Sequence, residues 1–158
     1  MQEVRAKKAL GQHFLTDTRI AQRIAEALSG GGDVLEVGCG TGMLTRFLLA
    51  RSDITLYGAE VDDESIAYLH RHYPEFADRL YAQDFLHMPL GTMFPQGVKV
   101  IGNFPYNISS QIFFKILEHR DLVPECVGMV QKEVAVRIAE PAGSRDYGIL
   151  SVLLQAWY

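Results

Sequence analysis

The strongest constraint on the fold is a strand-like run that leads directly into a glycine-rich loop. Residues 33–37 (Asp-Val-Leu-Glu-Val) form a short apolar run, as expected of a buried strand. The loop Gly38-Cys-Gly-Thr-Gly42 follows at once, and Leu44, Phe47 and Leu48 then recur at the spacing of a helix face. A strand, a glycine loop and a helix in this order predict the first unit of a βαβ fold.

The rest of the chain repeats this alternation. Further strands are expected at residues 54–60, 80–82, 98–101 and 126–131. Further helices are expected after a cap at Thr16 or Asp17, from a cap at Asp62 or Asp63 to about His72, around residues 112–117, and over 132–139 and 147–158. This alternation predicts an α/β domain with a doubly wound, mostly parallel sheet.

Two details of this pattern are specific enough to be tested. In the first helix, the apolar side chains expected to share the buried face are Ile20, Ile24, Ala27 and Leu28. The stretch that contains Pro89, Gly91, Pro95 and Gly97 is expected to be a loop.

Composition places the chain among ordinary globular proteins. A length of 158 residues suits one domain, with 48% hydrophobic and 22% charged residues. The sequence contains no apolar run of the ~18–20 residues that a membrane span needs, and we expect a cytoplasmic monomer. Cys39 and Cys126 are expected to be reduced thiols, and the histidine spacing predicts no metal site. The net charge is −4, although Arg5, Lys7 and Lys8 form a local basic cluster.

The glycine loop predicts a nucleoside cofactor with positive charge. A dinucleotide fingerprint would place its third glycine at position 43, which is Met, and the Gly-Lys-Ser/Thr of a Walker A loop is absent. Glu36 precedes the loop, and an acid at this point disfavours pyrophosphate and favours a cationic ligand. S-adenosylmethionine, which carries a sulfonium and an ammonium, is such a ligand.

Two further acids follow strand-like runs. Glu60 lies ~20 residues beyond Gly38, the spacing at which a carboxylate accepts both hydrogen bonds of a ribose diol. Asp84 follows the third strand, where a carboxylate can accept from the adenine amine of the cofactor. Either acid alone is more often a helix cap or a turn residue. Three acids at three successive strand ends indicate a cofactor site.

The loop after the fourth strand is suited to hold an aromatic amine. Asn103 offers a carbonyl acceptor, and Pro105 fixes the backbone so that the Phe104 carbonyl can be a second one. Tyr106 provides a ring on which a planar base can stack. The alternative interpretation is a proline-containing turn before a helix.

The motifs together resemble those of ribosomal RNA adenine N6-dimethyltransferases of the KsgA type. The resemblance rests on Gln12-His-Phe-Leu15, residues 36–42, Glu60, Gln83-Asp84 and residues 102–109, and extends through residues 131–135 and 147–152. It runs from about Lys7 to the last residue. Asn-x-Pro-Tyr alone would indicate only an amino-methyltransferase.

The resemblance implies a class I, Rossmann-like methyltransferase and assigns roles to individual residues. Cofactor-binding roles fall on His13, Leu15, Glu36, Gly38, Gly40, Glu60, Asp84 and Asn103. Catalytic roles fall on Asn103, Phe104, Pro105 and Tyr106. Phe104 replaces the Leu or Ile common at its position, a change we expect to be tolerated because its backbone carbonyl is the working group.

The resemblance also implies a domain plan and a substrate. Residues 1–15 are expected to form a basic arm that begins the cofactor site. Residues 16–158 are expected to form the methyltransferase domain, without the last strands of the sheet and without the C-terminal helical domain. The implied reaction dimethylates the N6 amines of two adjacent adenosines in the 3′-terminal hairpin loop of 16S ribosomal RNA, with a role in ribosome biogenesis.

Other functions remain open at this point. An Erm-type methyltransferase acts on 23S ribosomal RNA, and DNA adenine methyltransferases share the Asn-x-Pro-Tyr loop but not the other motifs. A further alternative is an RNA-binding assembly factor of the small subunit in which catalysis is secondary.

Overall fold

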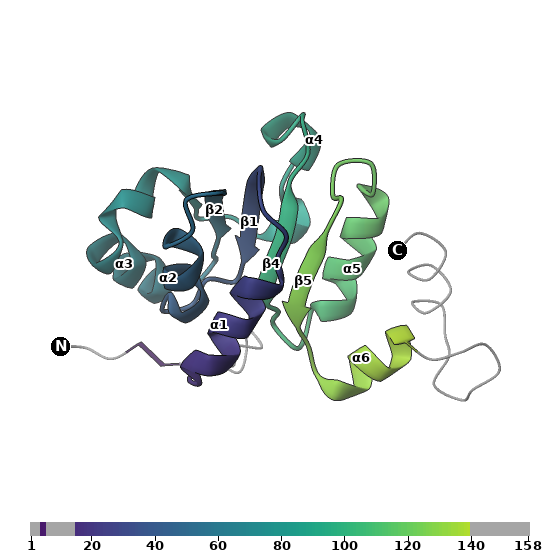
Figure 1. Cartoon of the computed structure of the whole chain (residues 1–158), viewed down its shortest axis with the longest axis horizontal. Coiled ribbons are helices and arrows are strands. Elements are labelled where there is room, and N and C mark those ends of the chain that lie inside the picture. Colours follow the sequence, from purple (N-terminus) through teal and green to yellow (C-terminus); the bar gives the residue numbers. More distant parts are fainter. Residues whose placement is uncertain (1–3, 6–14, 140–158) are drawn as a thin grey trace.

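The computed structural model describes residues 4–5 and 15–139, which form a parallel sheet covered by helices (Figure 1). The described strands are β1 (Asp33–Val37), β2 (Thr55–Ala59), β3 (Leu80–Tyr81), β4 (Lys99–Asn103) and β5 (Cys126–Met129). They pair in the order β3-β2-β1-β4-β5, and every pairing is parallel. The predicted doubly wound α/β architecture is therefore confirmed.

The described helices connect these strands. They are α1 (Thr18–Ala27), α2 (Met43–Leu49), α3 (Asp63–His72), α4 (Leu90–Met93), α5 (Ser109–Glu118) and α6 (Lys132–Ala139), with 3-10 helices at Pro74–Arg79 and Phe85–His87. Asp17 caps α1 by accepting from the Arg19 amide at 2.9 Å, and Asp62 caps α3 by accepting from the Ser65 amide at 3.0 Å. In both cases one of the two predicted caps is confirmed.

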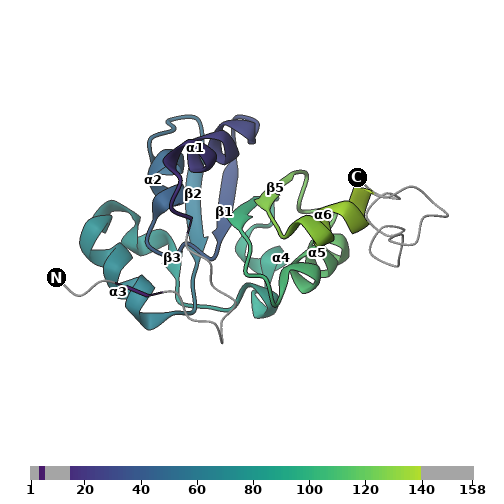
Figure 2. The ribbon, with the colours of Figure 1, turned by 90° about the horizontal axis from the view of Figure 1, so that it is seen from below.

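Helices lie on both sides of the sheet (Figure 2), and two apolar cores fill the space between the helices and the sheet. Val34, Leu56 and Ile101 belong to the core that α1, α2 and α3 cover. Leu35 and Val100 belong to the other core, which includes side chains of α4 and α5. Successive strand residues point to opposite faces, so a strand with helices on both sides is apolar throughout. This explains the continuous apolar runs in the sequence.

The predicted buried face of α1 is partly wrong. Leu28 is buried, but Ile20 is 39% exposed and Ala27 is exposed. The buried positions are Ala21 and Ala25, which lie four residues apart on one side of the helix. Small side chains at these positions let α1 pack closely on its neighbours. Ile24 is half-buried and packs against the same core as Leu28, so the prediction is wrong for Ile20 and Ala27 only.

The prediction of a loop between β3 and β4 is also partly wrong. It contains the 3-10 helix Phe85–His87 and the short helix α4, and it buries Phe85, Met88, Leu90 and Phe94 against the second core. Burial of these four side chains stabilises short helical turns. The prolines and glycines of this stretch had favoured a loop prediction instead. The prediction of a helix at residues 147–158 lies outside the described residues.

Strand β4 ends later than predicted and β5 ends earlier. Gly102 and Asn103, assigned to a loop by the sequence, pair with Gly128 and Met129 of β5. The Phe104 amide then donates to the Met129 carbonyl at 3.1 Å. Asn103 is therefore the last residue of a strand, and its backbone is held by the sheet.

Phe104 occupies space that two glycines provide. Its ring is 1% exposed, packs edge-on to Phe113 with centroids 5.8 Å apart, and lies against Gly102 and Gly128. A β-carbon at Gly128 would overlap the ring. This packing explains how the chain accommodates phenylalanine at a position where the related motif has a smaller side chain.

We expect Gly128→Ala to lower the free energy of unfolding by about 1–3 kcal/mol, because the added methyl group displaces the Phe104 ring. Phe104→Leu in the same chain should recover part of the loss, since the shorter side chain leaves room. Urea unfolding of the two single variants and the double variant measures this coupling. Strictly additive effects would contradict the proposed packing.

The helices of the described part of the chain are too short or too polar to cross a membrane.

Candidate functional site

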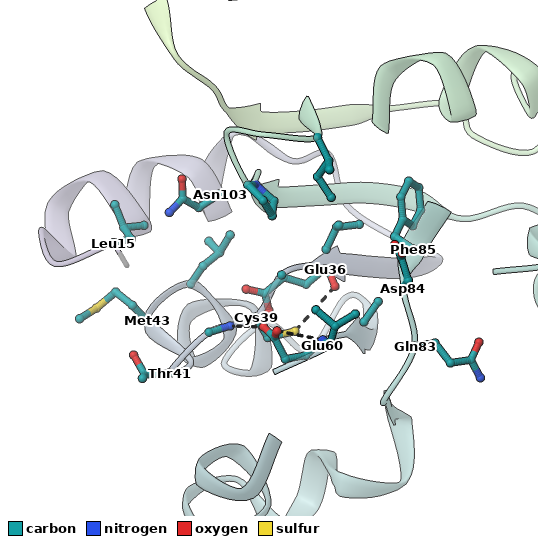
Figure 3. Close-up of a pocket in the computed structure, with 18 of the residues that line it drawn as sticks. Leu15, Glu36, Cys39, Thr41, Met43, Glu60, Gln83, Asp84, Phe85 and Asn103 are labelled. Atoms are coloured by element: carbon teal, nitrogen blue, oxygen red, sulfur yellow. Dashed lines mark hydrogen bonds between the residues drawn. The ribbon is translucent and has the colours of Figure 1, made fainter. Parts of the chain in front are cut away.

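A cavity opens at the carboxyl edge of the sheet, where β1, β2 and β4 end (Figure 3). Its volume of about 200 Å³ far exceeds the ~10–15 Å³ that one water needs, so it accommodates an organic molecule. Most of the predicted site residues line it: Leu15, Glu36, Gly38, Gly40, Glu60, Asp84, Asn103 and Pro105. Residues from five separate segments of the sequence thus meet at one cavity.

The glycine loop adopts a conformation that requires glycine. Gly38, Gly40 and Gly42 have φ angles of 75°, 56° and 85°, a region that side chains with a β-carbon rarely adopt. Gly42 begins α2, and a β-carbon there would collide with the Tyr73 ring. Gly42 is therefore needed for the backbone conformation at the start of α2 and for the close packing of the Tyr73 ring.

The same loop lies next to the Asn-Phe-Pro-Tyr loop. A β-carbon at Gly38 would lie 3.6 Å from Cδ of Pro105, so the two loops lie side by side across the ends of β1 and β4. The predicted cofactor loop and the predicted amine-binding loop therefore line the same cavity.

Glu60 connects the glycine loop to the end of β2. Its carboxylate is 4% exposed. Oε2 accepts from the Gly40 amide at 2.8 Å, and Oε1 accepts from the Val61 and Asp62 amides at 2.9 and 3.0 Å. Three backbone donors orient the carboxylate and compensate for its burial. These three hydrogen bonds fix the side chain at the cavity wall.

Glu36 lies deeper, on β1, and is 1% exposed. Its Oε2 accepts from the Thr45 hydroxyl of α2 at 2.6 Å. The pKa of Glu36 is raised to about 8, mainly by burial and in smaller part by the nearby Glu60 carboxylate, and the Thr45 hydrogen bond opposes this rise. The ion pairs between described residues include neither Glu36 nor Glu60. A cationic ligand at this wall would therefore favour the ionised form of Glu36.

The raised pKa makes stability depend on pH. Between about pH 4.5 and pH 8 the folded state keeps the Glu36 proton and the unfolded state loses it. We expect the free energy of unfolding to fall with rising pH across this range, by on the order of 1 kcal/mol per pH unit. Glu36→Gln should remove this contribution, because the amide is neutral throughout.

Thermal unfolding of the parent and of Glu36→Gln across this pH range measures the difference. The variant should gain stability relative to the parent as pH rises toward 8, and the Gln oxygen can still accept from Thr45. Parallel pH profiles would show that Glu36 is ionised in the folded state.

Asp84 lies on the other side of the two glutamates from Asn103 (Figure 3). It follows β3 and caps the 3-10 helix Phe85–His87: its Oδ1 accepts from the Leu86 amide at 3.0 Å, and its Oδ2 lies 3.2 Å from Nδ1 of His87. The side chain is 41% exposed and borders the cavity. The capping interpretation of Asp84 is correct, and its place at the cavity leaves it available to a ligand.

The amine-binding loop is divided between the cavity and the core. Asn103 and Pro105 line the cavity, and Oδ1 of Asn103 is buried. Phe104 has its ring in the core, and Tyr106 is half-buried; neither lines this cavity. His13 lies outside the described residues.

Several residues that line the cavity were not predicted from the sequence. Val61 is apolar yet 48% exposed at the cavity, and Phe85 and Ile108 add apolar surface. An apolar residue directly after a strand-end acid is a signal that could have identified Val61. Thr45 gave no such signal, because its contact with Glu36 depends on how α2 packs.

The thiols and histidines do not form a metal site in the part of the chain that the structure describes. Cys39 and Cys126 are free, and burial raises the pKa of both thiols. No group of three potential ligands was found among the described residues.

The sheet order, the glycine loop and the acids along the carboxyl edge define a class I methyltransferase fold. Solved structures agree. A dimethyladenosine transferase from Plasmodium falciparum is 32% identical, with a TM-score of 0.73 over 90% of this chain and 52% of that one. The 23S rRNA methyltransferase ErmE is 29% identical, with a TM-score of 0.65 over 79% of this chain and 50% of that one.

Sequence comparison defines the family. The model for ribosomal RNA adenine dimethylase matches residues 3–158, and the chain belongs to this family. A relative from Porphyromonas gingivalis named ribosomal RNA small subunit methyltransferase A is 55% identical over all of this chain. The chain spans 62% of that relative's length.

Proposed function

We propose that the chain binds S-adenosylmethionine in this cavity and directs its methyl group to the exocyclic N6 amine of adenosine in ribosomal RNA. The observation that carries the proposal is that the glycine loop, the acids Glu60 and Asp84, and the amide acceptor Asn103 line one cavity. Membership of the ribosomal RNA adenine dimethylase family supports the same reaction.

The residues around the cavity suit this cofactor. Glu60 is positioned to accept from a ribose diol, and Asp84 from an adenine amine, with Val61 and Phe85 as apolar surface for the base. Glu36 and Leu15 border the remaining wall, where a methionine end would lie. We propose that His13 and the arm of residues 1–15 complete that end, ahead of the methyltransferase domain of residues 16–158.

The cofactor, when bound, supplies an electrophilic methyl group on its sulfonium. The amine of adenine is a poor nucleophile because its lone pair is delocalised into the ring. Asn103 Oδ1 and the Phe104 carbonyl are proposed to accept from the two N–H groups, which favours a pyramidal nitrogen and stabilises the positive charge that grows there. The fixed end of β4 holds the amine in line, a proximity effect.

The remaining steps need little from the protein. The methylated ammonium is acidic enough to lose its proton to water, so a strong base is not required. A target base has to leave its stack, which costs a few kcal/mol, and stacking on Tyr106 is proposed to return ~1–3 kcal/mol of that cost.

The proposed substrate is small-subunit RNA. We propose that two adjacent adenosines in the 3′-terminal hairpin loop of 16S RNA become N6,N6-dimethyladenosine, as a step of ribosome biogenesis. The 55% identity to a protein named for the small subunit, against 29% to ErmE, favours this substrate over 23S RNA.

Methyl transfer to defined RNA tests the proposal. The protein is incubated with labelled S-adenosylmethionine and either immature small subunits or 23S RNA, and the nucleosides are identified by mass spectrometry. We expect N6,N6-dimethyladenosine in the small-subunit RNA alone. Label in 23S RNA alone would support the Erm-type function instead, and monomethyladenosine alone after long incubation would contradict dimethylation.

A further inference from the structure

Helix α5 carries a lysine whose charged end is buried beside the cavity. Lys115 is 7% exposed, and its Nζ donates to the Met88 carbonyl at 2.6 Å. The ammonium also lies 5.2 Å from the centre of the Phe85 ring, within the range of a cation–π contact. Ion pairs between described residues do not include Lys115. Burying an ammonium is costly, so its place here needs an explanation.

Both contacts of the ammonium are to the segment that carries Asp84. Phe85 is the first residue of the 3-10 helix that Asp84 caps, and Met88 is the residue directly after that helix. Phe85 itself lines the cavity. Burial lowers the pKa of Lys115, whereas the carboxylates of Asp84 and Glu118 raise it. The ammonium therefore holds both ends of a single helical turn beside one wall of the site.

Lys115 also links this wall to the opposite one. Helix α5 begins at Ser109, directly after the segment that runs from Asn103, at the end of β4, through Pro105 to Ile108. Figure 3 shows Asn103 and Asp84 on opposite sides of the cavity. The start of α5 thus follows the amine-binding loop. Its last turn, which carries Lys115, holds the segment that contains Asp84.

We propose that Lys115 is a positioning residue that holds Asp84 where it accepts from the 6-amine of the cofactor's adenine. The identity of the ligand in this inference rests on the proposed function. The way Lys115 holds the Asp84–Met88 segment does not depend on that function. A lysine that served stability alone would affect all ligands of the cavity equally. A positioning role predicts a specific loss of selectivity for adenine.

The binding test compares two ligands that differ at the 6-position of the base. S-adenosylhomocysteine carries an amine there, and S-inosylhomocysteine carries a carbonyl oxygen. Lys115→Met keeps the alkyl stem and removes the charge. We expect it to weaken binding of S-adenosylhomocysteine about tenfold or more, the effect of losing a hydrogen bond to a charged group, and to leave S-inosylhomocysteine nearly unchanged. Lys115→Met and Asp84→Asn should not add in the double variant.

Lys99→Met is the matched control. Lys99 is also mostly buried, and its Nζ donates to the carbonyls of Ser29 and Gly30 at 3.0 and 2.8 Å. It begins β4, at the edge of the sheet opposite the cavity. Its loss should leave the ratio of the two affinities as in the parent. Equal weakening of both ligands by Lys115→Met, or no weakening, would overturn the positioning role.

Hydrogen exchange tests the same role without a ligand. The amides of Leu86 and His87 donate to Oδ1 and to the carbonyl of Asp84. Lys115→Met should accelerate their exchange. The Ser65 and Ile66 amides, held in the same way by Asp62 of α3, should be unaffected. Unchanged exchange at Leu86 and His87 would overturn the inference even if the parent bound neither nucleoside, a result that would separately contradict the proposed function.

Discussion

Replacing Asn103 with alanine is expected to slow methyl transfer by about 10²–10³-fold, the usual cost of removing one group that stabilises charge in a transition state. The side-chain oxygen is buried at the end of β4, where pairing with β5 fixes the backbone. Alanine keeps this pairing and removes the acceptor. The affinity for S-adenosylmethionine should change only severalfold, because Glu60 and Asp84 remain.

Single-turnover rates with saturating cofactor measure this effect. Gln111→Ala, which removes an exposed amide from α5, is the control and should keep the parent rate. A variant at Asn103 that transferred methyl groups at the parent rate would contradict the proposed role. If function in subunit assembly survived in Asn103→Ala while transfer was lost, the assembly-factor alternative would be favoured.

Replacing Glu60 with alanine is expected to weaken S-adenosylmethionine binding by about 10²–10⁴-fold, since two hydrogen bonds from a ribose diol to a carboxylate are lost, each contributing ~1.5–3 kcal/mol. The loss also releases the Gly40, Val61 and Asp62 amides that Glu60 now holds. Both effects act on the same site. The affinity should fall further than in any single replacement of Asp84, which is more exposed.

Glu60→Gln separates the two effects. The amide keeps the size of the side chain but presents an N–H group toward at least one backbone donor, so binding should fall by an intermediate amount. Glu75→Ala removes an exposed glutamate away from the cavity and should bind as the parent does. Parent-like affinity in a folded Glu60→Ala variant would remove Glu60 from the proposed site.

The sequence predicts those features of the site that follow from strand ends. The run of residues 33–37 followed by three glycines indicated β1 and its loop, and parallel pairing then brings Glu60 and Asn103 to the same edge. Such features need only local patterns and the geometry of a parallel sheet.

Contacts that depend on helix packing could not be predicted. The hydrogen bond from Thr45 to Glu36 and the burial of Lys115 against Met88 join segments whose spacing in the sequence has no characteristic value. The ends of β4 and β5 were misplaced for a related reason, because Gly102 extends a strand only through its pairing with Gly128. Tertiary contacts override local propensity at these positions.

Calorimetric titration of the chain with S-adenosylmethionine tests the central claim most directly. The account predicts saturable binding at one site, competition by S-adenosylhomocysteine and no competition by a dinucleotide such as NAD. A folded chain that released no heat with S-adenosylmethionine, or that preferred the dinucleotide, would contradict the assignment of the cavity.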